Sequence, residues 1–222
     1  MTQDYAETLS IIAEITRLSF QETHQARENA LALSREITRA SSNTIRAIHR
    51  REFDRASTML REVSDLVVQT RVIRDEHPKV YYAGFVEAAV KEYAEAAATL
   101  AFTRKSSLPG YEELGIGVAP YLNGLAEAAG ELRRYLLDSL RRDDLDRCDE
   151  LLGVMDEVYA VLVTIDFPDA VTNGLRRTTD MVRAVLERTR GDLTLAMRQH
   201  GFERRLEAYQ EALNAYETKQ DS

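Results

Sequence analysis

Apolar residues recur every three or four positions along most of the chain, which is the spacing of one face of an α-helix. Two such stripes follow each other within residues 4–50: Ile11, Ile15 and Leu18, then Leu33, Ile37, Thr44 and Ile48. Neither glycine nor proline occurs before Pro78, so the pattern predicts one long first helix over about residues 4–50. A helix rises about 1.5 Å per residue, and one of this length extends beyond the core of a compact monomer. The first helix therefore indicates an oligomer or a long bundle.

The same spacing predicts six further helices. The second ends before Pro78, and the others cover about residues 80–103, 120–142, 144–164, 167–190 and 192–217. Between the third and the fourth lies SSLPGYEELGIGVAP, whose prolines and glycines predict a loop. No segment shows the alternation typical of a β-strand, so the predicted fold class is all-α.

Composition and charge narrow the classes of function. The chain has 222 residues, of which 44% are hydrophobic and 30% charged, and this composition suits a helical protein with a buried core. No apolar run approaches the roughly 18 residues that cross a membrane, and the N-terminus lacks the features of a signal peptide. With Cys148 as its single cysteine the chain cannot form an internal disulfide, so we expect a reducing, cytoplasmic location. A net charge of −8 argues against nucleic-acid binding over the whole surface but leaves room for a local basic patch.

The strongest candidate for chemistry is a pair of acids in the predicted third helix. Glu92 and Glu95 lie three residues apart in a seam that is apolar at both ends, so their Cβ atoms are expected about 5–6 Å apart. Two adjacent carboxylates repel each other, and burying them requires positive charge, for which a divalent cation is one source. The alternative is that the seam is exposed and that the acids pair with Lys91 or with arginines elsewhere.

A second pair of acids lies in the predicted fourth helix. Glu127 and Glu131 are four residues apart, nearly opposite a stripe of leucines, where acids are commonly solvated. The four histidines are scattered and show no ligand spacing: His24, His49, His77 and His200. None follows a glutamate by three residues, which argues against a ferritin-like di-iron centre.

Several blocks resemble the translin superfamily, particularly its translin-associated factor X (TRAX) branch. They are ALSREITRASSNTIRAIHR in the first helix, KEYAEA in the third, PYLNGL and GELRR in the fourth, and LRRTTDMVRAVLERTRGDL in the sixth. The blocks stand in the family's order and span about residues 26–193, and the likeness suggests a prokaryotic or archaeal type of member. The resemblance implies a single domain over residues 1–222, built as a seven-helix bundle, and we expect disorder after about residue 217.

The resemblance also implies a function. Subunits of the family assemble around a hollow barrel, commonly an octamer, that binds RNA and single-stranded DNA on its inner surface. The TRAX branch implies divalent-metal-dependent endoribonuclease activity. The family's acids fall on Glu92, Glu95, Glu127 and Glu131, with Glu127 at a position that is usually aspartate in TRAX. Carboxylates suit Mg²⁺ or Mn²⁺, so we expect all four as metal ligands and Glu92, Glu95 and Glu127 as catalytic residues.

Three further residues are candidates for nucleic-acid binding. Lys79 and Tyr82 precede the acid pair on the predicted third helix, and Arg104 closes that helix. A basic group beside an aromatic ring can hold a phosphate and stack a base. The alternative is ordinary charge and packing at helix ends.

Two other classes of protein remain open at this point. One is a non-catalytic translin-like protein that binds single-stranded RNA or DNA and in which the acids are structural. The other is a helical scaffold that binds neither metal nor nucleic acid. Cleavage of RNA separates the first class from the nuclease, and salt-dependent binding of oligonucleotides separates the second from both.

Overall fold

The computed structural model describes residues 5–220, and within that range it contains helices and loops without any strand. The helices are α1 (Tyr5–His49), α2 (Phe53–Glu76), α3 (Pro78–Tyr81), α4 (Phe85–Arg104), α5 (Tyr111–Leu114), α6 (Val118–Leu140), α7 (Leu145–Leu162), α8 (Asp169–Thr172) and α9 (Leu175–Gln220). The predicted all-α class and the long first helix are confirmed. The described part has nine helices rather than the seven expected, because three are short segments of four residues each and the last two predicted helices form one continuous helix, α9.

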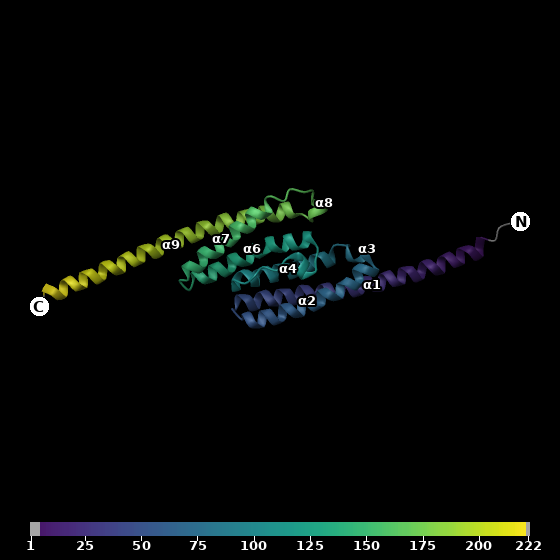
Figure 1. Cartoon of the computed structure of the whole chain (residues 1–222), viewed down its shortest axis with the longest axis horizontal. Coiled ribbons are helices and arrows are strands. Elements are labelled where there is room, and N and C mark those ends of the chain that lie inside the picture. The colour runs from purple at the N-terminus through teal and green to yellow at the C-terminus, as the bar shows by residue number, and fades with distance from the viewer. Residues whose placement is uncertain (1–4, 221–222) are drawn as a thin grey trace.

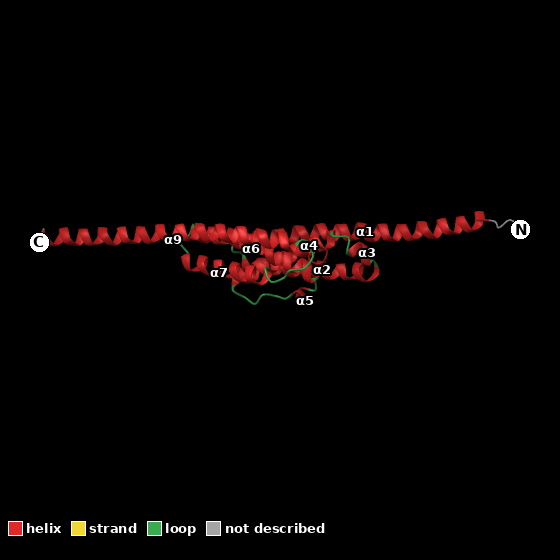
Figure 2. Ribbon diagram, turned by 90° about the horizontal axis from the view of Figure 1, so that it is seen from above, coloured by secondary structure: helices red, strands yellow, loops and turns green. Residues whose placement is uncertain are grey.

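Four long helices lie side by side in the order α1, α4, α6, α9. Helix α2 packs against α1 and α4, and α7 packs against α6 and α9, so these two form a second layer (Figure 2). The N-terminal part of α1 and the C-terminal part of α9 extend beyond the bundle in opposite directions (Figure 1). The centre of the bundle is therefore the contact between α4 and α6.

The predicted third helix is interrupted near its start. Helix α3 ends at Tyr81, and α4 begins after Gly84, whose φ of 95° lies in the left-handed region that favours glycine. The prediction that Lys79 and Tyr82 share a helix with the acids is therefore wrong. Lys79 lies in α3, and Tyr82 follows it before the turn.

The predicted boundary at Gly191 is also wrong, because α9 continues through this residue to Gln220. Glycine inside a helix costs about 1 kcal/mol relative to alanine. Leu186, Thr189 and Leu193 are nonetheless all buried, so the same face of the helix packs on both sides of Gly191. Continued burial favours one long helix over two. Residues 221 and 222, the end of the tail expected to be disordered, lie outside the described residues.

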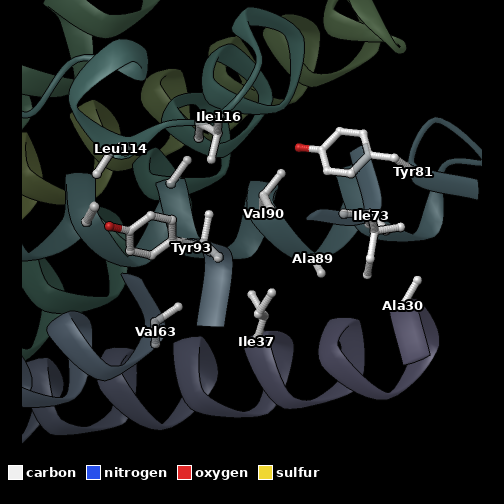
Figure 3. Close-up of a cluster of buried hydrophobic side chains, with 14 of the residues drawn as sticks. Ala30, Ile37, Val63, Ile73, Tyr81, Ala89, Val90, Tyr93, Leu114 and Ile116 are labelled. Carbon is white, nitrogen blue, oxygen red and sulfur yellow. The ribbon is translucent and has the colours of Figure 1, made fainter. Parts of the chain in front are cut away.

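One part of the core joins α1, α2 and α4 (Figure 3). Ile37 of α1, Val63 of α2 and Val90 of α4 are completely buried there. Leu114 and Ile116, from the segment predicted as a loop, pack against the same cluster. The segment between α4 and α6 is therefore fixed to the bundle through its apolar residues.

A second part of the core joins α6, α7 and α9. It contains Leu132 and Leu136 of the predicted leucine stripe, together with Cys148 and Leu151 of α7. Cys148 is fully buried, and burial raises the pKa of its thiol to about 11. A thiol with such a high pKa is a packing group and not a nucleophile.

Within residues 5–220, no helix combines the length and the apolar character that crossing a bilayer requires.

Candidate metal centre

Three acids meet where α4 packs against α6. Glu92 and Glu95 of α4 and Glu127 of α6 each offer a carboxylate oxygen, and these oxygens lie within 4.8 Å of one another. Glu92 and Glu127 are partly buried, and Glu95 is only 9% exposed. The structure thus brings together carboxylates that are more than thirty positions apart in the sequence and leaves them half withdrawn from water.

Gly124 explains why the two helices approach so closely. A Cβ atom built on Gly124 would lie 2.6 Å from the carbonyl oxygen of Lys91 and 2.7 Å from the Cβ of Ala94. Only a residue without a side chain fits in this contact. Glu127 follows Gly124 by about one helical turn, so the close packing places its carboxylate beside the acids of α4.

Lys91 supplies positive charge to the three acids. Its Nζ donates a hydrogen bond of 2.6 Å to Glu127 Oε1 and lies 3.6 Å from Glu92 Oε1. Burial alone would lower the pKa of Lys91, but the bond to Glu127 and the charges of the acids outweigh it and raise that pKa. Pairing with Lys91, the alternative that the sequence left open, is present in the structure.

Within residues 5–220, no side chain forms a hydrogen bond or ion pair with Glu95, and the charge of Lys91 acts on it only weakly. Burial is the largest influence on its carboxyl group, and the neighbouring Glu92 and Glu127 add repulsion, which together raise its pKa to about 8. Glu95 therefore holds a proton at neutral pH unless additional positive charge reaches the three acids.

Glu131, the fourth predicted ligand, lies outside this group of three. Its carboxylate accepts a hydrogen bond from Nε2 of His49, at the end of α1. This bond is the main reason that the pKa of Glu131 is lowered, although burial opposes it. His49 is itself buried, and its Nδ1 has no hydrogen-bond partner within the described residues.

The three acids fit a small divalent cation. Mg²⁺ binds oxygen at about 2.0–2.1 Å, so two of its ligands lie at most about 4.2 Å apart. Carboxylate oxygens within 4.8 Å of one another reach that spacing through small side-chain rotations. A cation would share the acids with Lys91, whose flexible side chain can turn away from Glu127.

The predicted nucleic-acid residues are not gathered at one place. Lys79 and the 61% exposed Tyr82 precede α4, whereas Arg104 lies in the last turn of that helix, about 20 residues or roughly 30 Å from its first residue. Arg104 donates hydrogen bonds to Asp54 and Ser57 of α2. Lys79 and Tyr82 therefore lie near each other, and Arg104 lies at the opposite end of α4.

Sequence reasoning missed His49, Lys91 as a partner of Glu127, and Gly124. The histidines show no ligand spacing along the chain, and the partner of His49 is 82 positions away. Gly124 did give a signal, since a glycine within a strong helical pattern often marks a close contact between backbones.

Comparisons with known proteins agree with this architecture. The profile described as the Translin family matches residues 25–191. An uncharacterized protein of Methanocaldococcus jannaschii, MJ0175, is 32% identical over 181 residues, which are 78% of this chain and 80% of the relative.

Solved structures of C3PO proteins have the same fold. AfC3PO, in its crystal structure and in its complex with duplex RNA, is 32% identical and gives TM-scores of 0.78 and 0.77. The similarity covers 83% of this chain and 96% of AfC3PO in both structures. Apo-NeC3PO is 20% identical, with a TM-score of 0.76 over the same shares of the two chains, and supports the fold alone. The matched profile covers most of the chain, including all three acids, and the chain therefore belongs to the Translin family.

Proposed function

We propose that this protein is a TRAX-like member of the Translin family, of a prokaryotic or archaeal type, that cleaves single-stranded RNA with Mg²⁺ or Mn²⁺. The observation that carries the proposal is the group of three carboxylates from two helices, with oxygens within 4.8 Å of one another. A group that is purely structural would be expected to hold its charges in closed ion pairs, as Asp156 and Glu187 do with arginines of α9. Glu95 instead is buried beside two acids, with its pKa raised to about 8.

The side chains have distinct roles in this proposal. Glu92, Glu95 and Glu127 hold the cation, and Lys91 neutralises two of them when no cation is bound. A divalent ion at such a site supplies positive charge to a phosphodiester and acidifies water. Glu131 stays ionised through its bond to His49 and adds negative charge beside the cation site.

Support for RNA as the substrate comes from the relatives. AfC3PO, which shares 32% of its residues with this chain, has been solved in complex with duplex RNA. The resemblance to the TRAX branch extends the expected ligands to single-stranded RNA and single-stranded DNA. We therefore infer a nucleic-acid ligand for the face that carries the acids.

Incubation of the purified protein with labelled single-stranded RNA tests the proposal. We expect fragments with Mg²⁺ or Mn²⁺ and none with EDTA, and the same reaction with duplex RNA and single-stranded DNA defines the preference. Intact RNA under all metal conditions, with a well-folded protein, would contradict the proposed nuclease.

A second candidate function is supported by Lys91. Its hydrogen bond of 2.6 Å to Glu127 shows that the acids can be partly neutralised without a cation. On this ground the chain would be a non-catalytic binder of single strands. Such a binder would retain RNA equally well in Mg²⁺ and in EDTA and would leave it uncut.

The proposal includes assembly into a hollow homo-oligomer, with an octamer as the family's common form. Both projecting arms carry exposed apolar side chains: Leu9, Ile12, Ile15 and Leu18 on α1, and Leu195, Phe202, Leu206 and Leu213 on α9. Exposed apolar rows on helices of this length are typical of protein interfaces. Light scattering should show a closed oligomer, and a monomer at micromolar concentration would contradict the assembly.

A further inference from the structure

A cavity of about 610 Å³ opens beside the acids, between α4, α6 and the start of α9. Lys91 and Glu127 line one wall, and Arg177, Thr178 and Met181 of α9 line another. Its volume lies in the range of sites that hold small molecules or parts of larger ones. The cavity therefore connects the candidate metal centre with a helix that sequence reasoning did not include in the site.

Arg177 is the unpaired charge in this cavity. Its guanidinium makes no ion pair and no side-chain hydrogen bond with any residue in the described range 5–220. Arg183 and Arg190 of α9 are paired, with Glu187 and Asp156. The neighbouring Arg176 is unpaired like Arg177 within the described residues, so the position of Arg177 in the cavity wall is what distinguishes it. Arg177 keeps all its side-chain donors available in a cavity that two acids, Glu87 and Glu127, also line.

The position of Arg177 relative to the acids is fixed by Asn123. This residue of α6 is 5% exposed, and its Nδ2 donates a hydrogen bond of 2.9 Å to the carbonyl oxygen of Thr172. Its Oδ1 accepts a bond of 2.5 Å from Thr178, which follows Arg177 directly. Glu127 lies one turn further along α6, so this buried amide, together with the apolar packing of α6 on α9, holds the backbone of Arg177 near Glu127.

An unpaired guanidinium that lines the same cavity as Glu127 fits a particular class of ligand. A planar guanidinium donates hydrogen bonds to two oxygens of one phosphate at once, whereas carboxylates repel a phosphate because both are negative. A ligand that spans the cavity would present one anionic group to Arg177 and another to a cation held by the acids. A chain of phosphodiesters has this repeated charge.

We propose that Arg177 binds a phosphate of the RNA backbone next to the phosphodiester that lies at the acids. The assignment of the ligand as RNA rests on the proposed function. Arg177 thereby holds the strand in register with the candidate metal centre, and fixing the reacting group in place is a large part of catalysis.

Arg176 provides a matched control. It is the neighbouring residue, it is also exposed at the surface, and it does not line the cavity. Arg176→Ala and Arg177→Ala remove the same charge from the same turn of α9. Any difference between the two variants therefore reports on the cavity and not on the net charge.

The experiment measures the binding of a labelled single-stranded RNA by fluorescence anisotropy in EDTA, where no cleavage interferes. We expect Arg177→Ala to weaken binding roughly 5- to 10-fold and to reduce the salt slope by about 0.7, the value for one lost phosphate contact on a single strand. Arg177→Lys should restore most of the salt slope. Arg176→Ala should bind nearly as the wild type does. Equal losses in Arg176→Ala and Arg177→Ala, or no loss in either, would overturn the assignment.

A cleavage assay with Mg²⁺ separates this inference from the proposed function. If the wild type cuts RNA and Arg177→Ala binds and cuts like Arg176→Ala, the inference fails and the nuclease stands. If the wild type does not cleave RNA, and Arg177→Ala loses affinity for RNA while Arg176→Ala does not, the inference stands and the nuclease fails. Inorganic phosphate that binds the wild type at Arg177 without displacing RNA would assign the residue to a small anion and overturn the inference.

Discussion

Glu95 and Glu131 are both largely withdrawn from water on neighbouring helices, yet the structure shifts their pKa values in opposite directions. Burial and the adjacent acids raise the pKa of Glu95 to about 8. The hydrogen bond from His49 lowers the pKa of Glu131 in spite of burial. Whether an acid at the contact of these helices is ionised therefore depends more on a hydrogen-bond donor beside it than on its burial. Glu131 receives its partner from the chain itself, whereas Glu95 lacks one, which is the condition that a bound cation would satisfy.

The largest expected effect comes from removing the charges of the two acids of α4. Glu92→Gln with Glu95→Gln should lower RNA cleavage at least ~100-fold, because losing even an indirect contact to a metal ligand costs ~10–100-fold. Glutamine preserves shape and removes the charge that attracts the cation, so RNA binding and assembly should persist.

The double variant should also melt slightly above the metal-free wild type, since the repulsion between the acids is gone. Cleavage and melting temperature are the two measurements. Full activity in a folded variant would contradict the metal centre. A lower melting temperature would instead favour acids that stabilise the bundle through ion pairs.

The next prediction concerns the pH dependence of stability that the raised pKa of Glu95 causes. Its folded pKa of about 8 lies above the ordinary value of 4.5, so its contribution to stability is complete below about pH 4.5 and is lost as the pH rises through 8. In EDTA the free energy of unfolding should therefore fall between pH 6 and pH 9, on the order of a few kcal/mol.

Glu95→Gln should remove this pH dependence, and Glu62→Gln, at an exposed position of α2, should keep it. Mg²⁺ should raise the melting temperature of the wild type more at pH 9 than at pH 6, because the cation competes with a proton. Parallel curves for the wild type and Glu95→Gln would refute the raised pKa.

These contrasts also show what the sequence could predict. The helical class and the long α1 followed from local spacing and the absence of glycine and proline, which act within a few residues. The pairing of Glu92 with Glu95 followed from the same local geometry. The position of Glu127 beside them followed from family resemblance, since no local rule brings α6 to α4.

The missed features depend on contacts between distant segments. His49 binds Glu131, 82 positions away, and Asn123 reaches Thr172, 49 positions away. Helical spacing gives no information about such pairs. The wrong boundary at Gly191 has the same origin, because local propensity disfavours glycine while burial of Leu193 against α7 keeps the helix intact.

Gly124 controls the distance between Glu95 and its repelling neighbour Glu127. Gly124→Ala forces its Cβ against the Lys91 carbonyl and should cost about 1–3 kcal/mol of stability. Gly130→Ala is the matched control on the same helix, since its Cβ would meet nothing within 4 Å, and it should stabilise by up to about 1 kcal/mol. Chemical denaturation measures both, and changes of the same sign in the two variants would contradict the close contact.

Without His49, Glu131 would resemble Glu95, because its partly buried carboxylate would have no hydrogen-bond donor. His49→Leu leaves a partly buried carboxylate without its donor and should lower the free energy of unfolding by about 1–3 kcal/mol at neutral pH. The lowered pKa of Glu131 contributes stability above its ordinary pKa of 4.5, and this contribution is lost as the pH falls through the folded value. The difference between wild type and His49→Leu should therefore shrink in acid. His24→Leu, at an exposed position of α1, serves as control and should change little.

The smallest effect is expected at Lys91. Its substitution tests directly whether a cation or a side chain of the protein neutralises the three acids. Lys91→Met removes the only positive charge that contacts the three acids within the described residues, so the protein in EDTA should lose about 1 kcal/mol of stability. If a cation can replace Lys91, saturating Mg²⁺ should restore most of that loss and should raise the melting temperature of Lys91→Met more than that of the wild type. Lys105→Met, which breaks an exposed pair with Glu150, should respond to Mg²⁺ as the wild type does. An equal loss for Lys91→Met in EDTA and in Mg²⁺ would mean that lysine alone is the partner of these acids, and the non-catalytic binder would then be the better description of the chain.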